Sequence, residues 1–457
     1  MADIRELETK PIGKLLWTFA LPAVITQVVA SIYNIVDRVF LGQYVGEMAI
    51  AGLAITLPLM NIIHAFGAMV GVGASARMSI VLGRKDIRWA EKILGNSILL
   101  TFFFGFLFVT GGYLFMDQIL ELFGASHDTI GFAREYMQIV LPGMFFTTLS
   151  FNLTGLIRAS GYPTKSMWIM AGGAVLNMIL DALFICLMGW GIAGAAWATT
   201  ISMVTMAVVS IAHFLQPSSF IRFKRHAWAP KLYIFRNVLL IGLSPFLMNF
   251  AASFVVALLN RQLIHYGNIA VALSGGDLAV GAYGVVNTYC SFLVMLILGI
   301  CQGMQPIAGY NYGARLYGRL HEVLTRTITM ATCVMTFGFL LGMFVPQLCA
   351  RAFTTDPELI MRVAHDMRIQ LLAFPIIGFQ IVTTNFFQCI GMPGKSIFLS
   401  LSRQLIFLLP PLLILPRLIG SDGIWWSMPI SDTLATFTTA YLFFRQMKKF
   451  KRMEAAQ

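Results

Sequence analysis

Charged residues are scarce in this chain of 457 residues, in which Asp, Glu, Lys and Arg together make up only 11%. Hydrophobic residues account for 58%, including 37 Phe and 26 Met. A water-soluble fold of this length does not need so much apolar surface. The composition therefore excludes an ordinary soluble domain and favours a chain whose main solvent is the lipid bilayer.

Cysteine is also scarce, with six residues, no CxxC pair and positions that lie almost entirely inside apolar runs. This pattern predicts neither a disulfide framework nor a zinc site. The chain also lacks HExxH and GxSxG, and in "GMPGKS" Cys389 stands where a phosphate-binding loop has its first Gly. We therefore expect no enzyme and no cofactor, and an intramembrane enzyme is the weaker alternative.

The net charge of +12 is unevenly distributed along the chain. Lys and Arg concentrate in connections on one side of the predicted spans, at 10–14, 77–92, 158–165, 222–236, 315–326, 395–403 and 445–452. This asymmetry follows the positive-inside rule and predicts a bacterial cytoplasmic (inner) membrane protein with both termini in the cytoplasm. No folded basic surface with base-reading elements is evident, so we expect no nucleic-acid partner. The first apolar run resembles an uncleaved span and not a signal peptide.

Charged and Gly/Pro punctuation divides the chain into twelve apolar runs. Each is long enough to cross ~30 Å of hydrocarbon, which takes ~20 helical residues. The predicted spans are 15–43, 48–76, 93–116, 129–157, 166–188, 191–215, 236–264, 278–306, 320–345, 361–389, 396–418 and 423–446. The expected fold class is therefore an all-α membrane protein with twelve transmembrane helices.

The two halves of the chain repeat one another. "ASGYPTKS" (159–166) matches "CIGMPGKS" (389–396), "GIAGAAW" (191–197) matches "GSDGIWW" (420–426), and "VLGRK" around Gly83 matches "NYGAR" around Gly313. All three pairs are about 230 residues apart, so two pseudo-symmetric six-helix bundles should be related by an axis along the membrane normal. We predict an N-lobe at 1–216, a basic cytoplasmic linker at 217–235 and a C-lobe at 236–457.

Asp37, Asp181 and Asp432 are the acids that fall well inside the predicted spans. A charge at mid-bilayer costs several kcal/mol unless it faces a cavity, pairs with a partner or takes up a proton. Each is therefore a functional candidate. The structural alternatives are that Asp37, beside Arg38, is an interfacial acid, and that Asp432, two turns from the outer edge, is structural.

Polar residues share a helix face with the first two of these acids. Asn177 lies one turn before Asp181, and Met170 continues that face. Asn34, Ala30 and Gln27 precede Asp37 at helical spacing, and the sixth span adds the hydroxyls of Thr199 and Thr200. We take Gln27, Ala30, Asn34, Met170 and Thr200 as substrate-cavity candidates, although amides in such spans often serve to bond another helix. Two carboxylates, an amide and a hydroxyl suit either a proton relay or an oxygen-ligated Na⁺, because adjacent carboxylates at low dielectric are costly to ionise together.

Four segments together resemble the multidrug and toxic compound extrusion (MATE) family, nearest its DinF/MepA-like branch. They are "LPAVITQVVASIYNIVDRVFLG" (21–42), "IRASGYPTKS" (157–166), "LNMILDALFI" (176–185) and "GIAGAAWATT" (191–200). The resemblance covers essentially the whole chain. It implies export of amphipathic, usually cationic organic compounds, driven by inward movement of H⁺ or Na⁺.

The resemblance also implies a cation-coupling site in the N-lobe. Its members would be Asp37, Asn177, Asp181, Thr199 and Tyr136, and the first four would be the ligands if the ion is Na⁺. Pro22 matches a proline at which the first helix bends. NorM-like relatives carry further acids in helices 7 and 10, but 238–259 and 370–389 contain none. We therefore expect coupling in the N-lobe alone.

These observations predict an antiporter that works by alternating access. The expected partners are small cationic drugs and membrane lipid, and the expected state is a monomer. A lipid-precursor flippase on the same kind of scaffold is the principal alternative. It should carry several Arg or Lys inside its cavity for an anionic head group, and the spans are nearly free of cations. A channel fits a duplicated bundle with acids in one lobe less well.

Overall fold

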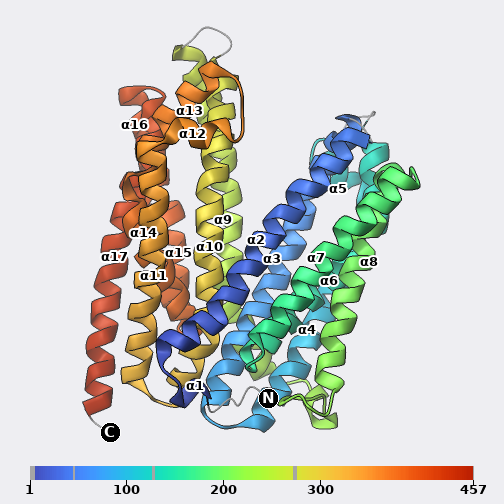
Figure 1. The fold of residues 1–457 in the computed structure, drawn as a ribbon, viewed down its shortest axis with the longest axis vertical. Helices are drawn as coiled ribbons and strands as arrows, with labels where there is room; N and C mark the ends of the chain where they lie inside the picture. Colours follow the sequence, from blue (N-terminus) through green and yellow to red (C-terminus); the bar gives the residue numbers. More distant parts are fainter. Residues whose placement is uncertain (1–5, 45–46, 126–128, 271–274, 456–457) are drawn as a thin grey trace. The chain divides into compact units, whose positions relative to one another are not determined.

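The computed structural model describes residues 6–44, 47–125, 129–270 and 275–455, and every regular element in this part of the chain is helical (Figure 1). The α-helices are α1 (Glu6–Thr9), α2 (Ile12–Tyr44), α3 (Glu47–Gly83), α4 (Ile87–Leu114), α5 (Met116–Leu122), α6 (Ile130–Ala159), α7 (Pro163–Asp181), α8 (Gly191–Leu215), α9 (Leu232–Ala270), α10 (Gly275–Gly313), α11 (Tyr317–Phe344), α12 (Pro346–Arg351), α13 (Pro357–Gln370), α14 (Phe374–Cys389), α15 (Pro393–Leu401), α16 (Leu409–Ile419) and α17 (Asp422–Ala455). Short 3₁₀ turns form η2 (Arg225–Trp228) and η3 (Leu371–Ala373), and π-helical turns form η1 (Ala182–Leu187) and η4 (Ser402–Phe407).

Eleven stretches of the described chain are helical, long and apolar enough to cross a membrane. They correspond to the first eleven predicted spans, but several helices extend beyond the predicted ends. The prediction ends the second span at residue 76, whereas α3 continues to Gly83. The reason is that a charge such as Arg77 ends an apolar run without breaking the backbone hydrogen bonds of a helix.

The last long helix, α17, is too polar to meet the same measure, because it is rich in Ser and Thr. All of their hydroxyls except that of Ser431 donate to carbonyls of the same helix. Ser427 Oγ donates to the Gly423 carbonyl (2.6 Å) and Thr436 Oγ1 donates to the Asp432 carbonyl (2.7 Å). A hydroxyl bonded to its own helix needs no water, so α17 can lie at membrane depth despite its composition.

The sequence repeat is also present in the backbone. Lys85 and Arg315 occupy equivalent positions in the two halves, and both have a positive φ of 61°, which is unusual for a residue other than glycine. Gly161 and Gly391 form a second equivalent pair, with φ of 98° and 72°. The same left-handed corner therefore follows the corresponding helix in each half, as expected of a duplicated bundle.

Helix contacts divide the chain into two compact units. Unit 1 comprises 1–10, 21–246 and 305–314, and unit 2 comprises 11–20, 247–304 and 315–457. Unit 1 thus contains the start of α9 and the end of α10 as well as most of the first half of the chain.

Within unit 1, paired glycines let α3 approach α9 and α10. A Cβ on Gly73 would lie 2.0 Å from the Val238 carbonyl oxygen, and one on Gly242 would lie 1.8 Å from the Met69 carbonyl oxygen. Gly83 and Gly313 meet the backbone of α10 and α3 in the same reciprocal way. Backbones in direct contact leave room only for hydrogen, so these positions require glycine.

The connection between the halves packs on α4. The side chain of Asn96 binds both ends of a backbone segment: Nδ2 donates to the Ala229 carbonyl (3.1 Å) and Oδ1 accepts from the Lys231 N–H (2.8 Å). The buried carboxylate of Glu91 pairs with Lys224 (3.3 Å) and His226 (3.0 Å). The region predicted as a basic linker is therefore held against α4.

Candidate functional site

A cavity of about 440 Å³ lies inside unit 1. Five helices line it, and α3, α6, α7 and α8 pack against one another around it (Figure 1). The lining residues are Thr26, Ala30, Tyr33, Leu57, Met60, Asn61, His64, Thr147, Ser150, Phe151, Met170, Gly173, Ala174, Asn177, Thr199, Ser202, Met203 and Met206.

Each wall of the cavity is one face of a helix. On α3 the face consists of Leu57, Met60, Asn61 and His64, which follow the helical spacing of three and four residues. The α7 and α8 faces follow the same spacing. Gly173 on α7 makes room for the side chain of Met206 in the cavity wall, since a Cβ on Gly173 would lie only 2.3 Å from it.

Two acids continue these faces beyond one end of the cavity. Asp181 lies one turn past Asn177 on α7, and Asp37 lies one turn past Tyr33 on α2. Asp181 is fully buried and Asp37 is half-buried. The charges of the two carboxylates act on one another, so they are close enough to form one electrostatic cluster.

The amide of Asn177 connects Asp181 to α8. In the orientation that satisfies both ends of the amide, Nδ2 donates to Asp181 Oδ2 (3.0 Å) and Oδ1 accepts from the Thr199 N–H (3.1 Å). Asp181 Oδ1 has no hydrogen-bond partner in the described part of the chain. A buried carboxylate oxygen without a donor is poised to receive a proton or a metal cation.

Two tyrosines border the acid cluster. Tyr136 on α6 is 3% exposed and lies close to the side chain of Thr199 and to the carboxylates of Asp37 and Asp181. Tyr33 is also close to both acids. The five residues predicted for the coupling site therefore lie close together. Asn177 and Tyr136 lie beside Thr199, and the two carboxylates are close enough to influence each other electrostatically.

A model of the MatE family matches residues 22–183 and 246–411, well over half of the chain. The chain belongs to the MatE family. Among curated relatives, the MATE transporter described here is 27% identical over 437 residues to multidrug export protein MepA of Staphylococcus aureus (strain MSSA476), covering 96% of this chain and 94% of MepA. It is 26% identical over 440 residues to MepA of Staphylococcus haemolyticus (strain JCSC1435), with the same coverage.

Solved structures share the fold. An outward-facing multidrug resistance MATE family transporter of the MOP superfamily matches with a TM-score of 0.90 at 23% identity, covering 98% of each chain. A MATE protein in the bent conformation matches with a TM-score of 0.91 at 23% identity, covering 99% of each chain. These matches confirm the predicted family and the predicted all-α fold with twelve helices in two six-helix bundles.

The predicted cavity residues of this MATE transporter lie in different places. Ala30 and Met170 line the cavity, whereas Gln27 and Thr200 are not among the lining residues. The Thr200 hydroxyl instead donates to the Ile139 carbonyl on α6 (3.1 Å). The side chain of Asn34 lies outside the described residues. Pro22 lies within α2, which is helical on both sides of it.

Sequence reasoning missed Asn61 and His64, which face the cavity from α3. The available signal was their spacing with Leu57 and Met60, which puts a polar pair and two apolar residues on one face of the second span. A polar face on an apolar helix indicates a cavity or a polar partner, on α3 as well as on α2.

Asp432 of the MATE transporter pairs with a cation in unit 2. Arg403 Nε donates to Asp432 Oδ1 (2.7 Å), and the neighbouring Ser431 hydroxyl donates to the Arg403 carbonyl (2.8 Å). Arg403 lies in the π-helical turn η4, where backbone carbonyls lose their usual helical donors. α17 thus binds both the side chain and the backbone of this turn.

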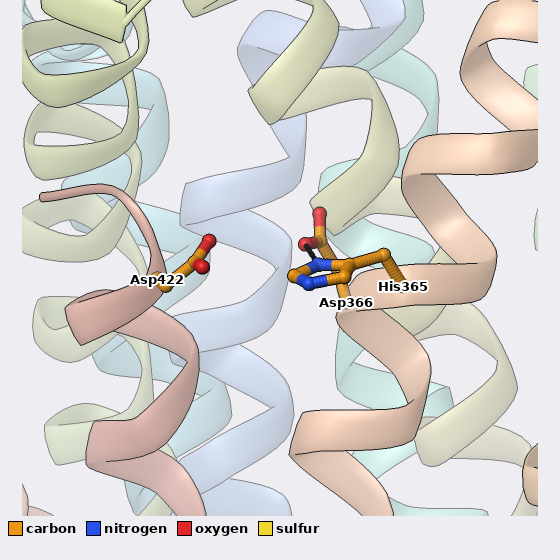
Figure 2. Close-up of side chains that lie close together, drawn as sticks. All are labelled: His365, Asp366 and Asp422. Carbon is orange, nitrogen blue, oxygen red and sulfur yellow. Dashed lines mark hydrogen bonds and ion pairs between the residues drawn. The ribbon is translucent and has the colours of Figure 1, made fainter.

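Asp366 on α13 is a further buried acid of this transporter, near the start of the span predicted at 361–389. It is fully buried, and it binds Arg362 Nε (2.9 Å) and His365 Nδ1 (3.1 Å). Figure 2 shows its carboxylate beside the His365 ring, with Asp422 of α17 facing them. These three side chains present ligand atoms within 4.8 Å of one another. Arg362, 3.8 Å from Asp422, already supplies positive charge, so the group is better described as an ion network than as a metal site.

Proposed function

We propose that this MATE transporter exports amphipathic organic cations in exchange for H⁺ or Na⁺. The coupling site would consist of Asp37, Asn177, Asp181, Thr199 and Tyr136. The proposal is supported chiefly by the buried Asp181 carboxylate, which lies at the end of the cavity with one oxygen lacking a donor.

Charge provides the coupling in this proposal. While Asp37 and Asp181 are ionised, their combined field attracts a cationic compound into the cavity. A proton or Na⁺ that binds the carboxylates from outside cancels that field, and the compound leaves outward. Release of the small cation to the cytoplasm restores the field. For useful alternating access, cargo and coupling ion must differ by a few kcal/mol in their affinity for the two states.

The walls of the cavity suit this class of cargo. Met60, Met170, Met203 and Met206 supply flexible, polarisable surface that adapts to different shapes. No Lys or Arg is found among the residues that line the cavity. An anionic diphosphate head group would need such cations, so a lipid-precursor flippase is the less favoured function. The curated relatives are named multidrug export proteins, which agrees with organic cargo.

The identity of the coupling ion determines which chemical groups the acid cluster must provide. A proton needs only a carboxylate that can take it up and release it. Na⁺ needs several oxygen ligands, and the carboxylates of Asp37 and Asp181, the amide of Asn177 and the hydroxyl of Thr199 would provide them. The transported ion is then a substrate, and no further cofactor is proposed. We place the transporter in the bacterial cytoplasmic membrane as a monomer with both termini inside.

Ethidium export from inverted vesicles tests the proposal. An imposed pH gradient or Na⁺ gradient should drive ethidium uptake by the wild type, and Asp37→Asn or Asp181→Asn should slow it at least tenfold. The same change at the exposed Asp356 should leave the rate unaltered. Replacing Na⁺ by choline at fixed pH identifies the ion. Wild-type rates in both cavity variants would contradict the assigned coupling site.

A further inference from the structure

The imidazole of His64 lies at the opposite end of the cavity from the acid cluster. Asp37 is about 10 Å before the end of α2 at Tyr44, whereas His64 is about 26 Å past the start of α3 at Glu47, at 1.5 Å per residue. The two helices are consecutive and run in opposite directions. His64 is therefore roughly 15 Å farther along the bundle than Asp37.

Beyond His64, α3 packs directly against α6. A Cβ on Gly67, one turn farther along α3, would lie 2.7 Å from Thr148, and one on Gly71 would lie 2.9 Å from Phe151. The two helices therefore touch directly past this point, at the wall that also carries the lining residue Phe151.

His64 itself is exposed, although it lies well inside the candidate span 52–83. An exposed imidazole at this depth faces either lipid, which is costly, or a polar space. His64 lines the cavity, so the second case applies.

Asn61, one turn nearer the acid cluster on α3, also offers amide N–H donors, whereas two hydroxyls at this end are occupied. The hydroxyls of Thr26 and Thr147 donate to carbonyls of their own helices, those of Pro22 (2.9 Å) and Gly143 (3.4 Å). They can still accept a hydrogen bond, but their protons are occupied. A neutral imidazole always carries one N–H, so His64 can donate to a ligand, and Ser150 offers a hydroxyl nearby.

We propose that the cavity has two polar ends and that His64 determines specificity at the second. Cargo would be bound best when it carries a cation at one end, a hydrogen-bond acceptor such as a carbonyl at the other, and roughly 15 Å between them, matched to the Asp37–His64 offset. The methionine walls between the ends contact the apolar middle of such a molecule. This inference rests on the proposed function, because the acid end must hold the cation.

Competition binding with purified protein tests the proposal. Two series of alkyl chains of graded length carry trimethylammonium at one end. At the other end, one series carries a dimethylamide and the other a branched alkyl group of similar size. The affinity of each compound is measured by its displacement of ethidium. In the wild type the dimethylamide should improve affinity at least threefold, and only for chains near the matching length. His64→Leu should abolish this preference, and His64→Gln, which keeps an N–H donor, should retain part of it.

Two controls separate the possible failures. His321→Leu makes the same change at an exposed position of α11 outside the cavity and should preserve the preference. Asp181→Asn should weaken both probe series equally. An unchanged preference in His64→Leu, with ethidium still bound, would overturn only the role of His64. Failure of the wild type to bind or export ethidium at all would overturn the proposed function.

Discussion

At the scale of single residues, the buried acids of this protein fall into two groups that differ in their partners. Asp432 and Asp366 have cationic partners at 2.7 and 2.9 Å, whereas the described contact of Asp181 is with an amide. An ion pair stabilises a buried acid, because the cation permanently neutralises the charge of the carboxylate. An acid without a cation keeps its ability to exchange charge with a ligand.

The Arg403–Asp432 pair should therefore behave as a stability element. Arg403→Met or Asp432→Leu alone strands a charge in a buried setting and should cost about 3 kcal/mol. The double variant removes both charges and should recover most of that loss. Thermal melting in detergent of the wild type, the single variants and the double variant measures the coupling. Additive losses in the double variant would show that the two charges do not stabilise one another.

These residues also show what sequence can reveal about a site. Asp37 and Asp181 were predictable because an acid is conspicuous in an apolar run, and the helical spacing located Asn177. The partner of Asp432 was not, because Arg403 lies 29 positions away on another helix and only folding brings them together. Asp366 was not singled out, because it lies within two turns of the start of the predicted span 361–389, close to Arg362.

At the scale of elements, helix packing depends on where glycine allows backbones to touch. α3 meets α9 and α10 at four glycines, and each meeting point has a carbonyl oxygen where a side chain would begin. The close packing of α3 on α6 at Gly67 and Gly71 has a local sequence signal, since small residues four apart favour close helix approach. The sequence did not predict the pairing of α3 with second-half helices, because nothing local specifies that contact.

Gly242→Ala should lower the melting temperature by several degrees and reduce the yield of folded protein. Its Cβ would lie 1.8 Å from the Met69 carbonyl oxygen, so α3 and α9 must separate. Gly111→Ala is the matched control, because no atom lies within 4 Å of its added Cβ and alanine favours helix. Equal melting temperatures for the two variants would mean that this helix contact contributes little to stability.

At the scale of the whole molecule, composition and repetition were enough to predict the fold class. Twelve apolar runs and a half-chain repeat imply two similar bundles, and matching left-handed corners at Lys85 and Arg315 carry that repeat into the backbone. A hydropathy measure applied to the described helices finds eleven spans and omits α17, in which most Ser and Thr hydroxyls donate to carbonyls of the same helix. The π-helical turns η1 and η4 were not predicted from the sequence.

The distribution of Lys and Arg also makes a prediction for the whole molecule. A green fluorescent protein fused after Gln457 should fluoresce, and alkaline phosphatase fused there should be inactive, because the positive-inside rule keeps this end in the cytoplasm. A phosphatase fusion after Phe344, at the end of α11, should be active. The reverse pattern at both sites would invert the assigned topology.

The cavity walls come entirely from α2, α3, α6, α7 and α8, all encoded in the first half of the chain. The two halves of the chain are similar in sequence, and the cavity described here lies in the first. Bacteria selected in the laboratory for tolerance to an unfamiliar toxic compound should therefore acquire their adaptive substitutions mainly between codons 26 and 206.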